Sequence, residues 1–178
     1  MKLTVGGQTY SLPLQIKADP RVQVSPEALR QQFDLAQRIE NQQMAIVRIY
    51  SQAAGLRSRL TAARGKASGS VSKSIDAVIK KIDDVAGVKP EDNPANSIGK
   101  PATDFTSLRY LQGAYANLDA SVESADAAPS MGKTQTLAKY QQILDAALAK
   151  WESVKSSDLP QLNAKLKSAG QGPIELTD

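Results

Sequence analysis

The sequence contains no cysteine and no histidine among its 178 residues. The lack of cysteine excludes disulfide bonds, thiolate metal sites and thiol nucleophiles. The lack of histidine removes the most common general base and the most common zinc ligand. Catalysis would therefore depend on carboxylates, lysine, tyrosine, serine or threonine. We expect a non-catalytic protein that carries no cofactor and no metal.

Aromatic residues and long apolar runs are also scarce. Aromatic residues account for 4% of the chain, whereas the apolar fraction is 41%; this balance is typical of amphipathic helices packed through aliphatic side chains. No stretch approaches the roughly 18 apolar residues of a membrane span, so we expect none. The formal net charge of +4 is far from the dense basic loading of a dedicated nucleic-acid binder, which disfavours nucleic acid as a partner.

The first part of the chain, residues 1–20, predicts a β-hairpin. Gly6-Gly7 fits a two-residue turn, because glycine accepts the positive φ that such turns require. The second strand alternates so that its apolar side chains share one face, which makes them a candidate interaction surface; these residues are Tyr10, Leu12, Leu14 and Ile16. Pro13 lacks a backbone donor and favours an edge strand.

Two strands cannot hide such a face by themselves. We therefore interpret the hairpin as the last piece of a β-sandwich, and the chain as a fragment of a larger parent protein. In that case the remainder of the parent covers the face. Otherwise the helical part of this chain covers it, or a second copy adds strand to strand at the exposed edge.

Four amphipathic segments follow and predict a mainly α fold, a four-helix-bundle-like domain over residues 25–169 with a C-terminal tail at 170–178. Ser25 and Pro26 mark the start of the first helix, which ends near Arg64. The next helix covers 71–85, and Asp104 is expected to cap the third. The apolar stripes of the four helices supply the expected core: Phe33, Ile39, Ile46, Ile49, Leu56, Ile75, Ile82, Leu111, Leu118, Leu144, Leu148 and Trp151.

The fourth stripe begins at Leu137 and continues through Leu166, beyond a kink or restart near Pro160. Ser130 is expected to cap this helix. Gly132-Lys133-Thr134 resembles the end of a phosphate-binding loop, but it lacks the earlier glycine and the entering strand, which favours an ordinary helix start. The adjacent Asp83 and Asp84 diverge by about 100° on a helix, so we expect solvated carboxylates there.

Positive charge gathers between the first and second helices. The residues that form this candidate basic patch are Arg57, Arg59, Arg64, Lys66 and Lys73, followed by Lys80 and Lys81, and only Asp76 opposes them between residues 57 and 81. Such a patch can meet phosphates or an acidic surface. No aromatic side chain is interleaved for base stacking, so a solvated basic end of the bundle is the simpler interpretation, and weak polyanion binding stays as an alternative.

Several motifs together resemble a known family: Leu3 to Tyr10 with the sequence LTVGGQTY, Asp19-Pro20-Arg21, Gln32-Phe33-Asp34, Leu148 to Trp151, and Asp158 to Asn163 with the sequence DLPQLN. They are similar to the C-terminal end of large bacterial proteins with sortilin-like β-propellers, often labelled BNR-repeat glycosyl hydrolases. In that family a sandwich-like module ending in a hairpin precedes a helical tail.

The resemblance implies a helical accessory or interaction module of a larger secreted, periplasmic or cell-surface protein. Its partners would be the rest of that protein, or a second copy bound through the hairpin. The alternative is that the chain is part of a glycoside hydrolase whose catalytic residues lie outside it. No catalytic residue of the family can be carried over to this chain, because the matched motifs lie outside the propeller.

Overall fold

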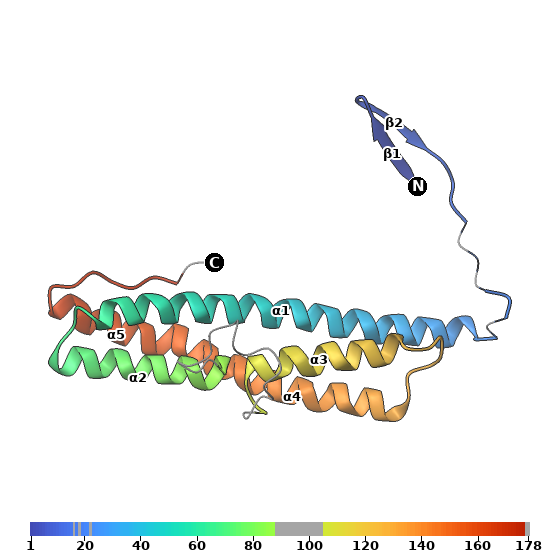
Figure 1. The fold of residues 1–178 in the computed structure, drawn as a ribbon. Helices are drawn as coiled ribbons and strands as arrows, with labels where there is room; N and C mark the ends of the chain where they lie inside the picture. Colours follow the sequence, from blue (N-terminus) through green and yellow to red (C-terminus); the bar gives the residue numbers. More distant parts are fainter. Residues whose placement is uncertain (16, 18, 22, 88–104, 177–178) are drawn as a thin grey trace.

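The structure, a computed structural model, describes all residues except 16, 18, 22, 88–104 and 177–178. The described residues form an elongated helical bundle, with a small antiparallel hairpin that stands away from it at the N-terminal end (Figure 1). The predicted fold class, mainly α with an N-terminal hairpin, is confirmed. No helix among the described residues combines the length and apolarity needed to cross a bilayer.

The hairpin consists of β1 (Lys2–Val5) and β2 (Gln8–Ser11), paired antiparallel. Gly6 and Gly7 form the turn with φ of +56° and +79°, the left-handed conformations that a primed two-residue turn requires. The second strand is shorter than predicted. It ends at Ser11, so Leu14 lies beyond the sheet, and Ile16 is outside the described residues.

Helix α1 (Pro26–Arg64) is 39 residues long and runs the whole length of the bundle. The Ser25 hydroxyl accepts a hydrogen bond from the Ala28 amide at 3.1 Å, which satisfies one of the donors left free at a helix start. The buried side chains of α1 recur at spacings of three, four and seven and form one apolar stripe: Leu35, Ile39, Ile46, Ile49, Ala53, Leu56 and Leu60.

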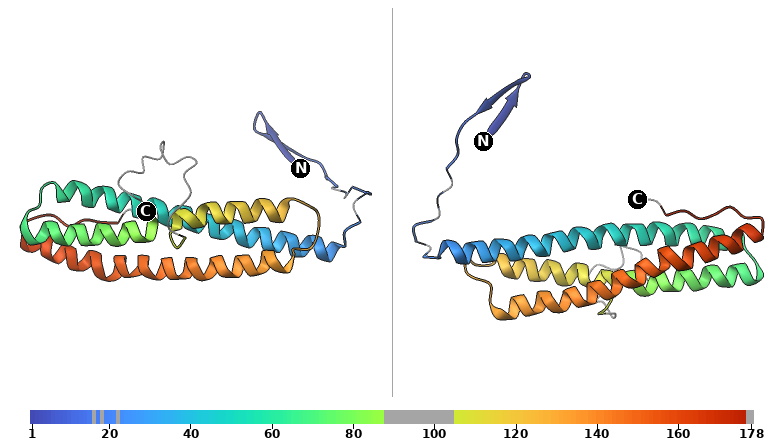
Figure 2. Two further views of the ribbon diagram at one scale, coloured as in Figure 1. Left: turned by 60° about the horizontal axis from the view of Figure 1, so that its bottom comes forward. Right: turned by 180° about the vertical axis from the view of Figure 1, so that it is seen from behind.

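The remaining helices are α2 (Gly69–Ala86), α3 (Leu108–Glu123), α4 (Met131–Ser153), η2 (Val154–Asp158) and α5 (Leu159–Ser168). Helices α2 and α3 lie nearly in line and cover successive halves of α1, while α4, η2 and α5 form one continuous helical rod (Figures 1 and 2). The bundle therefore has three helical rods, and the rod that contains α2 and α3 is interrupted between these two helices.

The start of α3 differs from the prediction. The residue that caps it is Ser107, whose hydroxyl accepts from the Tyr110 amide at 3.3 Å, whereas Asp104 lies outside the described residues. Ser107 also faces Gly87, the residue that ends α2. Gly87 has φ of +74°, and a Cβ atom there would lie 2.5 Å from the Ser107 Oγ. The end of α2 and the start of α3 are thus in direct contact.

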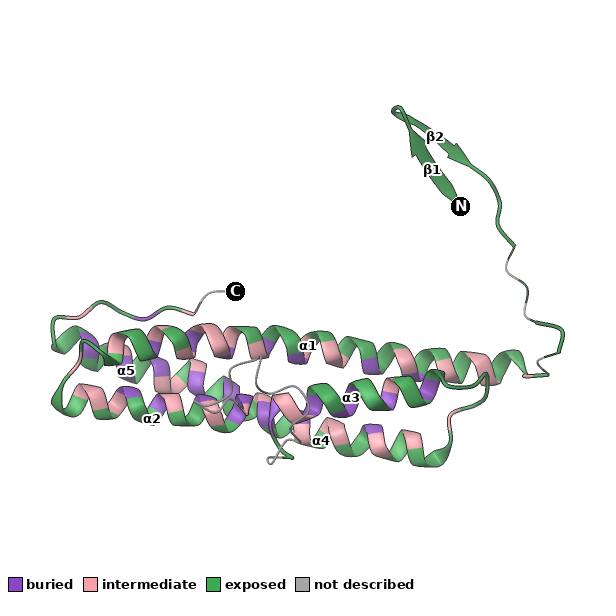
Figure 3. Ribbon diagram, in the orientation of Figure 1, coloured by how far each residue is buried: buried purple, intermediate pink, exposed green. Residues whose placement is uncertain are grey.

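Most of the expected core residues are buried, including Trp151, which is 2% exposed. The expectation for Phe33 is wrong, because its side chain is 62% exposed. Successive helix residues are about 100° apart, so Phe33, two positions before the buried Leu35, points to the opposite side of α1. Leu148 is only half-buried and packs at the edge of the core. Buried residues recur along each rod, and the first turns of α1 and α4 are exposed or partly exposed (Figure 3).

The predicted kink in the last rod is a π-helical segment, η2. The Leu159 amide bonds the Val154 carbonyl, five residues earlier. The buried positions of this rod are spaced by three, four or seven residues except here, where Val154 is followed by Leu159. One π turn absorbs the extra residue and keeps both side chains on the core face. Pro160, which has no amide to donate, is accommodated in the first turn of α5.

The tail after Gly170 packs back along the bundle. Ile174 is buried, and its amide and carbonyl both bond the Asn163 side chain, at 2.9 and 3.0 Å. The Arg59 guanidinium donates to the Glu175 carbonyl at 2.5 Å. The described part of the tail therefore belongs to the packed bundle.

Candidate functional site

The hairpin has one apolar and one polar face. Leu3 lies opposite Tyr10, and Val5 opposite Gln8; because side chains alternate along a strand, these residues share a face. Met1 and Leu12 extend this face, since the Met1 carbonyl accepts from the Leu12 amide at 3.1 Å and the Met1 ammonium donates to the Leu12 carbonyl at 2.8 Å.

The opposite face is polar. Thr4 and Thr9 lie opposite one another, and their hydroxyls are 3.0 Å apart and hydrogen-bonded. Lys2 and Ser11 complete this face. The hairpin is therefore amphipathic, as a strand pair that packs one face against a partner has to be.

None of the described helices covers the apolar face. Every residue of both strands is exposed, and the apolar side chains of the face are each more than half exposed: Met1, Leu3, Val5, Tyr10 and Leu12, with Leu14 just beyond the strand. The sequence suggested three partners that could bury this face: the parent protein, the helical part of this chain, or a second copy. In the described residues the helical part of this chain does not bury it. The second-strand residues were predicted for this face, whereas Leu3 and Val5 were not, although strand alternation and pairing place them there as well.

Three residues of the predicted basic patch are paired with acids. Arg57 binds Asp83 at 2.6 Å and Arg64 binds Asp76 at 3.0 Å. Lys81 binds Asp158 at 2.6 Å. Between residues 57 and 81 the sequence itself contains only one acid, Asp76. The fold adds Asp83, two turns after Asp76 on α2, and Asp158, from the opposite rod, and these acids reduce the local positive charge.

The other predicted patch residues are spread over different positions. Arg59 bonds the tail at Glu175, and Lys66 and Lys73 are exposed on the α1–α2 turn and on α2. Asp76 holds the pKa of Arg64 above its ordinary value through a hydrogen bond and charge.

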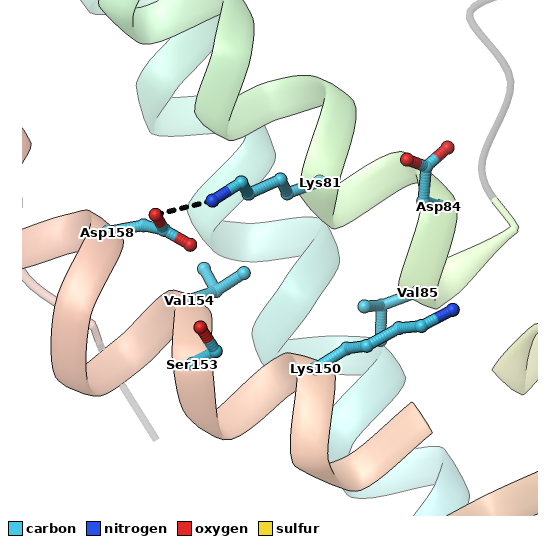
Figure 4. Close-up of a pocket in the computed structure, with 7 residues that line it drawn as sticks. All are labelled: Lys81, Asp84, Val85, Lys150, Ser153, Val154 and Asp158. Atoms are coloured by element: carbon cyan, nitrogen blue, oxygen red, sulfur yellow. Dashed lines mark hydrogen bonds and ion pairs between the residues drawn. The ribbon is translucent and has the colours of Figure 1, made fainter. Parts of the chain in front are cut away.

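A crevice of about 220 Å³ lies where α2 meets the π-helical segment (Figure 4). It is the place where two carboxylates, Asp84 and Asp158, line one cavity. The Asp158 carboxylate is bound to Lys81, and the Asp84 carboxylate points away from it in Figure 4. The two acids therefore do not converge as the acid pair of a glycoside hydrolase does.

Two further motifs adopt ordinary structural positions. Ser130 caps α4, and its hydroxyl accepts from the Lys133 amide at 3.4 Å, as predicted. The Lys133 ammonium donates to the Ser121 carbonyl at 2.6 Å and links α4 to α3. Among the residues that the structure describes, no group of three or more acidic side chains is placed to hold a metal ion.

A polar layer crosses the core and was not predicted. Gln42 occupies the core phase of α1, three residues after Ile39 and four before Ile46. Its amide oxygen accepts from the Tyr115 hydroxyl of α3, and its amide nitrogen donates to Gln141 of α4. A glutamine at a position where the helix pattern requires an apolar residue was the sequence feature that could have predicted this layer. One residue from each rod thus meets in a single hydrogen-bonded layer.

The electrostatics of this layer follow from burial. Tyr115 is fully buried, and burial, with a smaller effect of the Asp145 charge, raises its pKa to about 12. The ring of Tyr140 lies 5.6 Å from that of Tyr115, and burial raises the pKa of Tyr140 as well. Both phenols are held in the neutral form that donates a hydrogen bond, which suits a structural role.

A scan against protein-family models, a search of curated proteins and a search of solved structures each found no match to this chain. The resemblance to the sortilin-like propeller proteins therefore depends on the sequence motifs alone. The VGGQTY motif forms the strands and turn of the hairpin, and DLPQLN forms the junction of η2 with α5. Both motifs have structural positions in this fold.

Proposed function

We propose that this chain is a non-catalytic interaction module, in which a helical bundle carries an amphipathic β-hairpin for pairing with a β-sheet outside the bundle. The observation that supports this most directly is the exposed apolar face of the hairpin, formed by Met1, Leu3, Val5, Tyr10 and Leu12. Burial of apolar surface contributes roughly 25 cal/mol per Å², so a partner that covers this face gains affinity from it.

The sheet belongs, in this proposal, to the remainder of a larger secreted or surface protein, as the family resemblance implies. Each strand of the hairpin also has a free edge, because the described sheet has two strands. A free edge offers backbone groups for strand addition. The fourteen residues between Ser11 and Pro26 separate the hairpin from the bundle in the sequence, so the proposal places the partner sheet on the hairpin and outside the bundle.

Photo-crosslinking in cells that express the protein tests this proposal. A photoreactive residue at Leu3 samples the apolar face, and one at the adjacent Thr4 samples the polar face as a matched control. We expect Leu3 to crosslink to one apolar β-strand segment, identified by mass spectrometry, and Thr4 to crosslink far less. Equal crosslinking from both faces, or crosslinks to many unrelated segments, contradicts the proposal.

The non-catalytic part of the proposal is tested separately. The purified chain should show no turnover on a panel of aryl glycosides, because the crevice acids Asp84 and Asp158 do not converge and histidine is absent. Turnover that survives repurification and is lost in Asp158→Asn would contradict it.

A further inference from the structure

The outer side of α1 carries a second apolar stripe that the bundle does not use. Phe33, Met44 and Val47 are 62%, 59% and 50% exposed. At about 100° per residue, these three side chains lie within one sector of α1, on the opposite side from the buried stripe that contains Leu35 and Ile46. The helices α2, α3 and α4 pack on the inner side, so this stripe faces outward.

Two pairs of residues along this side of α1 are equidistant from Met44. Glu40 and Arg48 are each four positions from Met44, and Phe33 and Gly55 are each eleven positions from it. In an antiparallel pair of α1 helices related by a two-fold axis at Met44, residues equidistant from Met44 lie level with one another. Glu40 of each copy is then level with Arg48 of the other, so two oppositely charged pairs form at once.

Gly55 is the second feature that this pairing accounts for. Glycine in a helix interior costs about 1 kcal/mol relative to alanine, and a Cβ atom at Gly55 would meet only the Arg59 guanidinium, at 4.0 Å. The packing within one chain therefore does not demand glycine here. In the antiparallel pair Gly55 is level with Phe33 of the other copy, and the missing side chain leaves space for the aromatic ring.

We infer that the outer stripe of α1 is a self-association surface, and that its occupant is the same stripe of a second copy in antiparallel orientation. The charges at Glu40 and Arg48 favour this occupant, because a parallel pairing in register would place each of them level with its own like-charged copy. At 1.5 Å of rise per residue, the two Pro26 residues lie about 54 Å apart in this dimer, so the two hairpins emerge at opposite ends.

A charge swap tests the pairing directly. Glu40→Arg alone and Arg48→Glu alone each replace two attractive pairs by repulsive ones, and we expect each to weaken the dimer about tenfold, since exposed ion pairs contribute up to about 1 kcal/mol each. The double variant Glu40→Arg/Arg48→Glu should restore the wild-type dissociation constant to within about threefold. Lys139→Glu, an exposed charge reversal on α4, is the matched control and should have no effect.

Single cysteines give a second and independent readout, because the chain has no cysteine of its own. Met44→Cys places the two thiols on the two-fold axis, within the 4.4–6.8 Å between Cα atoms that a disulfide requires, and should crosslink under mild oxidation. Gln142→Cys, exposed on α4, should stay monomeric under the same conditions. Circular dichroism checks that each variant keeps its helical content.

The control for the hairpin is a chain that lacks residues 1–18, measured by sedimentation equilibrium. We expect its dimer to persist, which separates this inference from the proposed function of the hairpin. A wild-type chain that stays monomeric up to about 1 mM, where the binding free energy is near −4 kcal/mol, would overturn the inference. A dimer that is lost with residues 1–18 or is unaffected by the charge reversals would overturn it as well.

Discussion

Gly87 and Ser107 show how one residue can fix the junction between two helices. Gly87 ends α2 in the left-handed region, and its amide donates to the Asp83 carbonyl at 2.8 Å. Its Cα faces the serine that caps α3. Any side chain at position 87 meets both a backbone conformation that L-residues rarely adopt and the side chain of Ser107.

Gly87→Ala should therefore destabilise the protein by about 1–3 kcal/mol, from backbone strain and from displacement of Ser107. Gly113 provides the opposite case, because it lies inside α3 and a Cβ atom added there would have no neighbour within 4 Å. Gly113→Ala should stabilise the protein by about 0.5–1 kcal/mol. Urea denaturation of both variants measures the difference, and a loss of stability in Gly113→Ala would contradict the described environment of α3.

The buried phenol of Tyr115 makes stability depend on alkaline pH. Its pKa rises from 10.0 to about 12 on folding, so the folded state favours the neutral phenol. The resulting stabilisation is fully present below pH 10 and is lost as the pH rises to 12; two pKa units correspond to at most about 3 kcal/mol.

Tyr115→Phe removes this dependence. At pH 7 the variant should be less stable by about 1–2 kcal/mol, because Gln42 loses its donor. The difference in the free energy of unfolding between the wild type and the variant should become smaller between pH 10 and 12, because only the wild type has this phenol to ionise. Denaturant titrations at pH 7, 10 and 11.5 test this, and a gap that widens with pH would show the opposite sign.

At the scale of elements, the π-helical segment explains why an apolar stripe with an irregular spacing still forms one rod. The step from Val154 to Leu159 is five residues, and η2 absorbs the extra residue. Removing one exposed residue from this segment should therefore restore a regular α-helical stripe. Pro160 must be replaced at the same time, since in a regular helix its ring would clash with the preceding turn.

Deletion of Ser156 in the background of Pro160→Ala should change the free energy of unfolding by no more than about 1 kcal/mol relative to Pro160→Ala alone. Deletion of Gln142, an exposed residue in the middle of α4, is the control. It rotates Leu144, Ala147 and Trp151 away from the core and should cost more than about 4 kcal/mol, or prevent folding. Equal costs for the two deletions would contradict the role given to η2.

The elements themselves were predictable to different degrees. Helical periodicity and the caps at Ser25 and Ser130 predicted α1 and α4 well, because these signals are local. Phe33 was misplaced because an apolar residue on an amphipathic helix is counted as core unless its phase against Leu35 and Ile39 is compared. The ion pairs Arg57–Asp83 and Lys81–Asp158 join distant residues, so no local pattern in the sequence predicted them.

At the scale of the whole molecule, the chain separates into a bundle with its own core and a hairpin that contributes nothing to that core. The buried residues all lie between Leu35 and Ile174. The hairpin face was predictable from strand alternation, whereas its separation from the bundle was not, because the sequence does not specify what covers an apolar face. The outer stripe of α1 was likewise not recognised, because Phe33 was first assigned to the core.

The most direct measurement compares the full chain with residues 19–178 by circular dichroism and thermal unfolding at the same concentration. If the hairpin is a separate interaction element, the shortened chain keeps the helical signal of the full chain, and its unfolding midpoint changes by less than about 1 °C. For a domain of this size, each kcal/mol of lost stability lowers the midpoint by about 2–4 °C. A fall of that size or more would show that the hairpin stabilises the bundle, contradicting its role as a free interaction element.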